Sequence, residues 1–148
     1  MNWACRMSDS VISRHPTLGT KWAYEWGVIL KGISAVWENT HDQRYLDYIQ
    51  ACVNAYVLPD GTIRTYRQEE YNIDNINTGK LLFFLHRQTQ DPRYLKAIAS
   101  LRGQLATHPR TASGGFWHKN IYPHQMWLDG IYMCAPFYAQ FAHYFDEP

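Results

Sequence analysis

The 148-residue sequence has few cysteines and no long apolar run. Cys5, Cys52 and Cys134 are an odd set without a C-x-x-C pair, so neither a disulfide framework nor a zinc cage is expected. No apolar stretch approaches the roughly 20 residues of a membrane span, and the first residues lack a charged segment followed by an apolar one. We therefore expect a soluble, cytoplasmic protein without a membrane partner.

Basic residues are not concentrated either. The formal net charge is +1, and the 14 Lys and Arg residues are scattered along the chain. The sequence therefore gives no sign of a basic surface that would bind nucleic acid. The sequence contains no phosphate-binding loop, no dinucleotide fingerprint and no G-x-S-x-G motif. Histidine pairs with H-x-x-x-H spacing are absent too. We therefore expect no nucleic-acid partner, no cofactor and no metal.

Aromatic residues, in contrast, are abundant. The chain has six Trp, eleven Tyr and six Phe, and 46% of its residues are hydrophobic, which is typical of a globular protein. A large aromatic core is one explanation of these rings. A cleft whose rings pack against sugar faces is the other, and composition alone leaves both open.

A repeat organises the middle of the chain. Residues 40–49 read THDQRYLDYI and residues 89–98 read TQDPRYLKAI. Asp42 and Asp91 are suited to cap a helix N-terminus, and Pro92 to fill its first position. Apolar residues recur at helical spacing before and after each turn. Each unit is therefore predicted to be a helical hairpin with a short T-x-D turn, in an all-α array of hairpins.

We expect an N-terminal lead-in over residues 1–19 and a hairpin array over residues 20–148. A third unit begins near His124, and the sequence ends at Asp146-Glu147-Pro148, which resembles the next capping turn. A third hairpin interrupted there would leave an apolar flank available for self-association. The predicted helices lie near residues 21–38, 43–56, 75–88, 92–106 and 124–144.

Three acidic residues occupy equivalent places in the three units. Glu25, Asp74 and Asp129 each lie the same distance before the aspartate of the next turn. In a toroid of hairpins the starts of the first helices converge at one end, so these carboxylates should approach one another. Acidic residues also favour helix starts simply by capping and by the macrodipole, which is the interpretation we prefer for Glu25.

Asp129 differs from the other two because apolar residues surround it in MWLDGIYM. A carboxyl that loses solvation has a raised pKa, which suits a general acid near neutral pH, and a nearby Asp74 would raise that pKa further. His118 and His124 lie in the glycine-bearing loop that leads to Asp129, and we regard both as candidate functional residues. Trp127, directly before Leu128-Asp129, is a candidate sugar contact.

The block SGGFWHKNIYPHQMWLDGIYM, residues 113–133, carries a specific resemblance to a known family. Together with KWAYEWGVILKGI at residues 21–33, it resembles the unsaturated rhamnogalacturonyl hydrolases of glycoside hydrolase family 105. The resemblance implies an (α/α)6 barrel, of which this chain would be about the N-terminal half. It also implies removal of a 4,5-unsaturated uronic acid from pectin-derived oligosaccharides without a metal or cofactor.

The same resemblance implies roles for individual residues. Asp129, in WLDG, would be the catalytic acid and base, and Asp74 its carboxylate neighbour. His118 and Tyr24 would contact the oligosaccharide substrate. Two other interpretations compete: a truncated barrel fragment that binds carbohydrate without catalysis, and another (α/α)6 enzyme such as an epimerase. Epimerases of this shape favour histidine pairs, whereas the best-placed group here is an aspartate.

Overall fold

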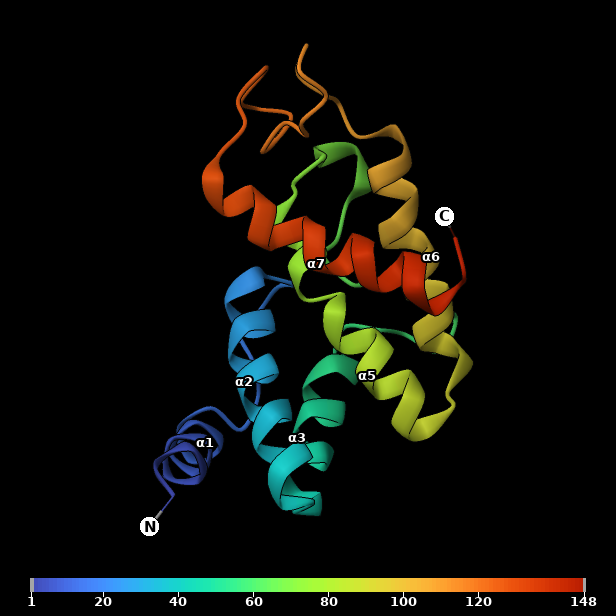
Figure 1. The fold of residues 1–148 in the computed structure, drawn as a ribbon. Helices are drawn as coiled ribbons and strands as arrows, with labels where there is room; N and C mark the ends of the chain where they lie inside the picture. The colour runs from blue at the N-terminus through green and yellow to red at the C-terminus, as the bar shows by residue number, and fades with distance from the viewer. Residues whose placement is uncertain (1, 148) are drawn as a thin grey trace.

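The computed structural model describes residues 2–147, and these form a helical array (Figure 1). No β-strand occurs in this range beyond two isolated bridges, and no described helix is long and apolar enough to cross a membrane. The predicted all-α class is confirmed. The helices are α1 (Trp3–Arg14), α2 (Tyr24–Thr40), α3 (Gln43–Asn54), η1 (Gln68–Glu70), α4 (Asp74–Asn77), α5 (Lys80–Thr89), α6 (Pro92–Thr107) and α7 (Leu128–Tyr144).

Two hairpins, α2–α3 and α5–α6, contain the repeated T-x-D turns. The Thr40 hydroxyl accepts a bond from the Asp42 backbone N–H at 3.3 Å, and the Asp42 carboxylate accepts from the Arg44 N–H at 3.0 Å. The second turn repeats this pattern, with Asp91 accepting from the Arg93 N–H at 2.9 Å. These bonds satisfy the free N–H groups at the start of α3 and α6, so the predicted repeat is confirmed.

The N-terminal segment contains a helix that the sequence did not predict. Asn2 caps α1, its side chain accepting from the Ala4 N–H at 3.0 Å. Long-range bonds hold α1 against the first hairpin: the Tyr45 hydroxyl donates to Asp9 at 3.0 Å, and the Tyr48 hydroxyl donates to the His15 carbonyl at 2.6 Å. The segment expected as a lead-in is therefore packed structure.

The helix predicted near residues 75–88 is divided into α4 and α5 at Thr78-Gly79. The N–H groups of Gly79 and Leu82 bond to carbonyls three residues earlier, which tightens the helix at this point. A Cβ on Gly79 would lie 2.5 Å from Leu101 and 2.9 Å from Phe137, so glycine permits the close approach of α6 and α7. The helix expected from residue 124 begins only at Leu128, because Trp127 is still extended.

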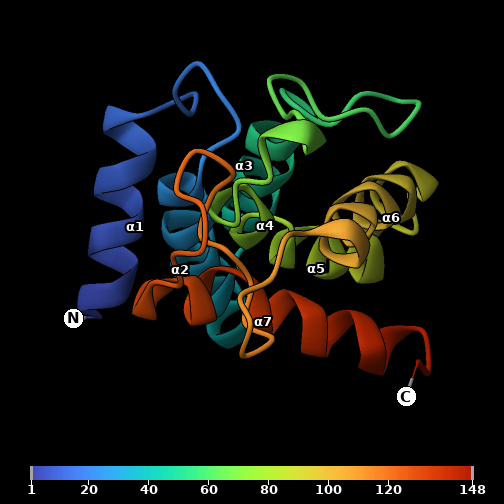
Figure 2. The same cartoon turned by 90° about the horizontal axis from the view of Figure 1, so that it is seen from above.

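Helix α4 lies near the centre of the molecule, in contact with both α2 and α7 (Figure 2). Two bonds attach it to the segment before α2: the Trp22 indole N–H donates to the Asn75 carbonyl at 2.8 Å, and the Thr78 hydroxyl donates to the Ala23 carbonyl at 2.9 Å. The starts of α4 and α7 lie at the same end as the long loops, which gather at the top of Figure 1. This is the arrangement expected for a site on one rim.

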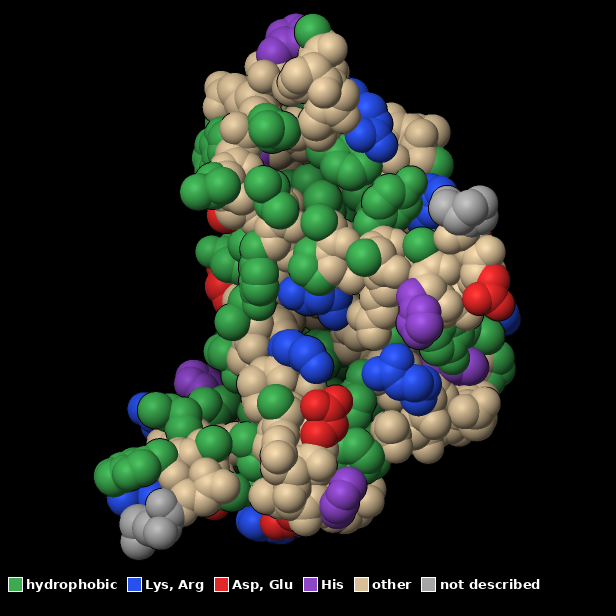
Figure 3. Space-filling model, in the orientation of Figure 1, with side chains coloured by type: hydrophobic (Ala, Val, Ile, Leu, Met, Phe, Trp, Pro, Cys, Tyr) green, Lys and Arg blue, Asp and Glu red, His purple; other side chains and the backbone are tan. Residues whose placement is uncertain are grey.

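One face of α7 lacks a partner among the described residues. Leu128 is 86% exposed, and Ile131 and Tyr132 are also exposed, while Met133 and Phe137 point into the core. Hydrophobic side chains are visible along this face in Figure 3. The apolar flank predicted from the sequence is present, and self-association through it remains a prediction.

Two glycines of α2 provide a matched test of this packing. A Cβ on Gly27 would lie 2.8 Å from the Cα of Thr78, whereas a Cβ on Gly32 would meet nothing within 4 Å. We expect Gly27→Ala to lower the free energy of unfolding by about 2 kcal/mol through overpacking. Gly32→Ala should raise it by about 0.5–1 kcal/mol, because alanine favours the helix. Urea denaturation of both variants checks this, and similar changes in both would contradict the tight α2–α4 crossing.

Candidate active site

The candidate site lies where α4, α7 and the loop between α6 and α7 meet. Asp74 is the first residue of α4, and Asp129 lies in the first turn of α7. The loop is fixed by backbone bonds on both sides of His118: its N–H donates to the Gln125 carbonyl at 2.7 Å, and its carbonyl accepts from the Ile73 N–H at 3.1 Å. Potential ligand atoms of Asp74, His118 and Asp129 consequently lie within 4.8 Å of one another.

Asp74 is buried, with 7% of its surface exposed. One carboxylate oxygen, Oδ2, lies 2.8 Å from the Nζ of Lys119, while Oδ1 lies 3.5 Å from Nε2 of His118 and has no hydrogen-bond partner in the structure. A buried carboxylate without a counter-charge is costly, so the ion pair with Lys119 stabilises it here. Oδ1 is itself inaccessible to solvent, so the described residues do not present it to a substrate.

Lys119 is a site residue that the sequence reasoning missed. It directly follows His118 in the WHK segment, so its place beside a predicted site residue was visible, but its partner Asp74 lies far away in the sequence. Its contact with Asp74 at 2.8 Å places a positive charge inside the cluster.

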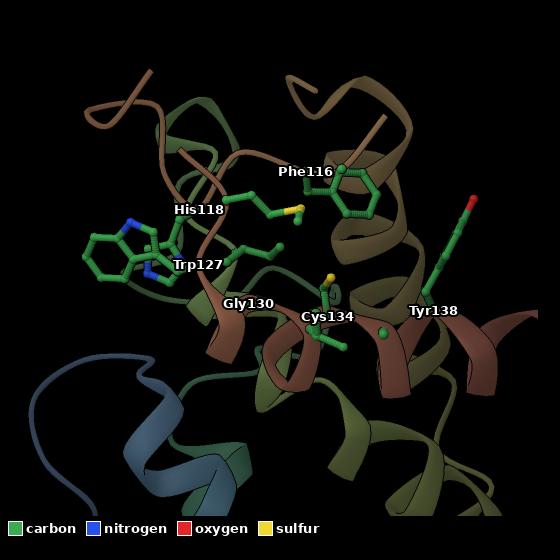
Figure 4. Close-up of a pocket in the computed structure, with 11 residues that line it drawn as sticks. Phe116, His118, Trp127, Gly130, Cys134 and Tyr138 are labelled. Carbon is green, nitrogen blue, oxygen red and sulfur yellow. The ribbon is translucent and has the colours of Figure 1, made fainter. Parts of the chain in front are cut away.

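His118 is 2% exposed and stacks on the indole of Trp127, with ring centroids 4.0 Å apart and planes inclined by 12°. Figure 4 shows the two rings side by side at one end of the pocket. Burial lowers the pKa of His118, although the charges of Asp74 and Asp129 oppose this shift. The imidazole is therefore neutral at neutral pH, and the stacked pair forms a rigid wall beside the carboxylates.

The expected burial of Asp129 is wrong for this chain, because its side chain is exposed. The apolar residues that surround it in the sequence do not enclose it in space. Leu128 and Ile131 point outward on the open face of α7, and only Gly130 of its nearest neighbours is buried. The loss of solvation expected for Asp129 is not provided by the described residues, while its proximity to Asp74 and His118 agrees with the prediction.

A polar groove and an apolar pocket adjoin at this cluster. The groove has a volume of ≈ 540 Å³, and Asp74, Lys119 and the predicted substrate contact Tyr24 all line it. The pocket, of ≈ 190 Å³, is lined by His118 and Trp127 (Figure 4). Glu25 also lines the groove but lies outside the carboxylate cluster, as expected of a helix-start residue.

His124 is placed differently from the other predicted contacts. Its backbone is left-handed, with φ of 63°, and its ring packs edge-on against Trp117 at 4.6 Å between centroids. It lines neither the polar groove nor the apolar pocket described above. The structure therefore brings together Asp74, His118, Asp129 and Trp127, and leaves His124 in the supporting loop.

The cluster also offers three ligands that suit a divalent cation, one each from Asp74, His118 and Asp129. A cation there would share Asp74 with Lys119, whose Nζ already lies against Oδ2. Since Lys119 supplies the counter-charge, the buried carboxylate does not depend on a metal for its neutralisation. The absence of a metal from the reaction remains a prediction.

His108 supports the loop that carries His118 and makes the stability of the fold depend on pH. Its Nε2 lies 2.8 Å from the Trp117 carbonyl and its Nδ1 lies 3.3 Å from the Gln104 amide, which fits a neutral ring that donates through Nε2 and accepts at Nδ1. Burial lowers the pKa of His108. The folded state thus binds fewer protons than the unfolded state between this lowered value and the ordinary 6.5.

Neutral His108 therefore makes its full contribution to the free energy of unfolding above about pH 6.5. This contribution is lost as the pH falls through the lowered pKa of His108. We expect the free energy of unfolding to decrease between pH 7.5 and pH 5.5. The decrease should be smaller in His108→Gln, which cannot titrate. Urea denaturation at the two pH values measures this, and equal decreases in both proteins would show that His108 makes no contribution.

Comparison with known proteins agrees with this geometry. The family model described as Glycosyl Hydrolase Family 88 matches residues 3–148. The unsaturated rhamnogalacturonyl hydrolase YesR of Bacillus subtilis (strain 168) is 26% identical over 136 residues, covering 87% of this chain and 37% of YesR. The structure of a glycoside hydrolase from family 105 of C. acetobutylicum ATCC 824 has a TM-score of 0.93 and 46% identity, covering 99% of this chain and 42% of that one.

The hairpin array is that of a partial helical barrel of the glycoside hydrolase type. The chain belongs to Glycosyl Hydrolase Family 88, and the resemblance to family 105 is confirmed. It spans less than half the length of either relative, 37% of YesR and 42% of the C. acetobutylicum protein.

Proposed function

We propose that this chain supplies the catalytic carboxylates of a barrel that removes 4,5-unsaturated uronic acid from pectin-derived, rhamnogalacturonan-type oligosaccharides. The observation that carries the proposal is the cluster of Asp74, His118 and Asp129, whose polar atoms lie within 4.8 Å in a member of this family. The name of YesR, an unsaturated rhamnogalacturonyl hydrolase, supports the substrate class.

In the proposed reaction the substrate ring is a vinyl ether with a double bond between C4 and C5. Asp129 in its acid form donates a proton to C4, which leaves an oxocarbenium-like centre at C5. The resulting carboxylate takes a proton from water as the water oxygen bonds to C5. The hemiketal then opens at the ring oxygen, and the hemiacetal formed at C1 releases the aglycone as an alcohol. This differs from displacement at C1 by two carboxylates.

The other residues of the cluster bind and orient the sugar. Asp74 lines the groove as the carboxylate neighbour of Asp129, and its Oδ2 is paired with Lys119. The stacked rings of His118 and Trp127 present an apolar wall for a ring face. Tyr24, from the start of α2, reaches the same groove. In this scheme no step requires a metal or an organic cofactor.

The competing function is carbohydrate binding without catalysis by this chain alone. The exposure of Asp129 favours it, because a general acid requires a shielded carboxyl, and the open face of α7 adjoins this side chain. We therefore propose catalysis for the closed barrel and binding for the chain by itself.

The test uses a hybrid barrel in which residues 3–148 replace the matching part of the C. acetobutylicum family 105 protein. Loss of the unsaturated uronate absorbance is followed with oligosaccharides from lyase-treated rhamnogalacturonan, using the parent C. acetobutylicum protein as the control. We expect turnover by the hybrid barrel, unaffected by EDTA, and none by the isolated chain. Turnover by the parent but not by a folded hybrid would contradict the proposal, and inhibition by EDTA would restore a role for a metal.

A further inference from the structure

Lys80 is a buried cation for which the described residues offer no carboxylate. It is the first residue of α5 and is 9% exposed. Its Nζ lies 4.1 Å from the centroid of the Tyr132 ring on α7. Burial lowers the pKa of Lys80, and the charge of nearby Lys31 lowers it further, so its surroundings disfavour the ammonium form.

Buried Asp74 and half-buried Arg93 differ from Lys80, because each has an ion-pair partner. Asp74 is paired with Lys119 at 2.8 Å, and the guanidinium of Arg93 lies 2.7 Å from Asp91. Buried charges in proteins are normally paired, since removal from water is otherwise uncompensated. Contact with one aromatic ring compensates only part of this cost. Lys80 is thus the exception among the described residues, and its environment lacks an anion.

The neighbours of Lys80 lie on α2 and α7: Lys31 is close enough to lower its pKa, and Tyr132 packs against its Nζ. Lys31, on α2, is exposed and bonds only to Ser34 at 3.5 Å among the contacts described. Leu128, Ile131 and Tyr132 are exposed on the same side of α7. Figure 3 shows basic side chains in the middle of this face, with hydrophobic groups beside them and an acidic side chain below. The surface therefore combines exposed apolar residues with two lysines, Lys80 and Lys31, that form no ion pair among the described residues.

We propose that Lys80, with Lys31 beside it, is a carboxylate-binding site in which a helix of the covering polypeptide places an Asp or Glu side chain. The occupant is the part of the barrel that this chain does not span, since the chain superposes on a family 105 structure with a TM-score of 0.93 but covers 42% of it. A helix with one carboxylate between apolar residues complements both the two lysines and the exposed apolar residues. This inference rests on family membership and is independent of the proposed reaction.

The test compares Lys80→Met in two contexts by thermal unfolding. In the isolated chain the substitution removes an unpaired buried charge, so the melting temperature should rise by about 3 °C. In the hybrid barrel the substitution leaves the partner carboxylate buried without a counter-charge, so the melting temperature should fall by roughly 6–10 °C. Lys96→Met, on the exposed surface of α6, removes the same charge and should change neither protein by more than about 1 °C.

The sign of the effect in each context decides the outcome. A fall in both proteins would mean that Lys80 acts only through local packing on Tyr132, and would overturn the proposal. A rise in both, or no change in the hybrid barrel, would show that no carboxylate reaches the site and would also overturn it. Acetate could also raise the melting temperature of the isolated chain but not that of its Lys80→Met variant. If the hybrid barrel is then unaffected by Lys80→Met, the occupant is a small anion rather than the barrel, and the proposal is overturned.

The carboxylate itself can be identified in the hybrid barrel. Each Asp and Glu of the covering polypeptide is replaced by Asn or Gln, alone and together with Lys80→Met. We expect one position at which the double variant melts within about 2 °C of Lys80→Met alone, because the two residues form one interaction. Additive effects at every position would overturn the assignment. A second copy of the chain as occupant would instead make the effect of Lys80→Met depend on protein concentration.

Discussion

Asp129→Asn in the hybrid barrel is expected to abolish loss of the vinyl-ether absorbance while leaving substrate binding measurable. Asparagine preserves the shape of the side chain but has no proton to donate. General acid and base catalysis is typically worth about 10²–10⁴-fold, and protonation of carbon has few substitutes, so we expect a loss at the upper end of this range. Initial rates give the loss, and titration of the inactive variant with the oligosaccharide gives the affinity.

Asp47→Asn is the matched control for that substitution. Asp47 is an exposed aspartate of α3 whose Oδ1 accepts a bond from Gln43 at 2.8 Å, and asparagine retains this acceptor. The control should keep full turnover. If Asp129→Asn also keeps near-normal turnover, then Asp129 only stabilises the start of α7 through the macrodipole, and the proposed mechanism is wrong.

The hairpin turns could be predicted from the sequence because their interactions are local. Thr40, Asp42 and Arg44 bond to one another within five residues, and the same letters recur in the second hairpin. Helix α1 could not be predicted in this way, because it has no such turn motif and its apolar residues are not fully buried, Ser8 being the one buried residue within it. Its position depends on distant partners, including the Tyr45 hydroxyl.

The candidate site was predictable in composition but not in environment. The three-unit alignment correctly brought Asp74 and Asp129 together, since equivalent helix starts converge on one rim. The burial of Asp129 was inferred from its neighbours in the sequence, and this failed because adjacent residues of a helix point in different directions. Lys119 was missed for the related reason that an ion pair between distant segments leaves no local pattern.

The ion pair of Lys119 and Asp74 leads to the second large effect, on stability. Lys119→Met leaves a carboxylate that is 7% exposed without its counter-charge, so we expect the free energy of unfolding to fall by about 3 kcal/mol. Asp74→Asn should cost only about 1 kcal/mol, because the longer lysine side chain can extend into the groove and reach water. Urea denaturation of the isolated chain measures both values, since this pair lies entirely within it.

The double variant Asp74→Asn/Lys119→Met separates the structural role of the pair from its role in the reaction. With both charges removed, the free energy of unfolding should return to within about 1 kcal/mol of the unmodified chain. Turnover of the hybrid barrel should not return, because Asp74 is one of the proposed catalytic carboxylates and an asparagine carries no charge. Recovery of both properties would assign the pair to folding alone. Recovery of neither would mean that the side chains stabilise the loop by packing, since a charge pair loses its effect when both members are absent.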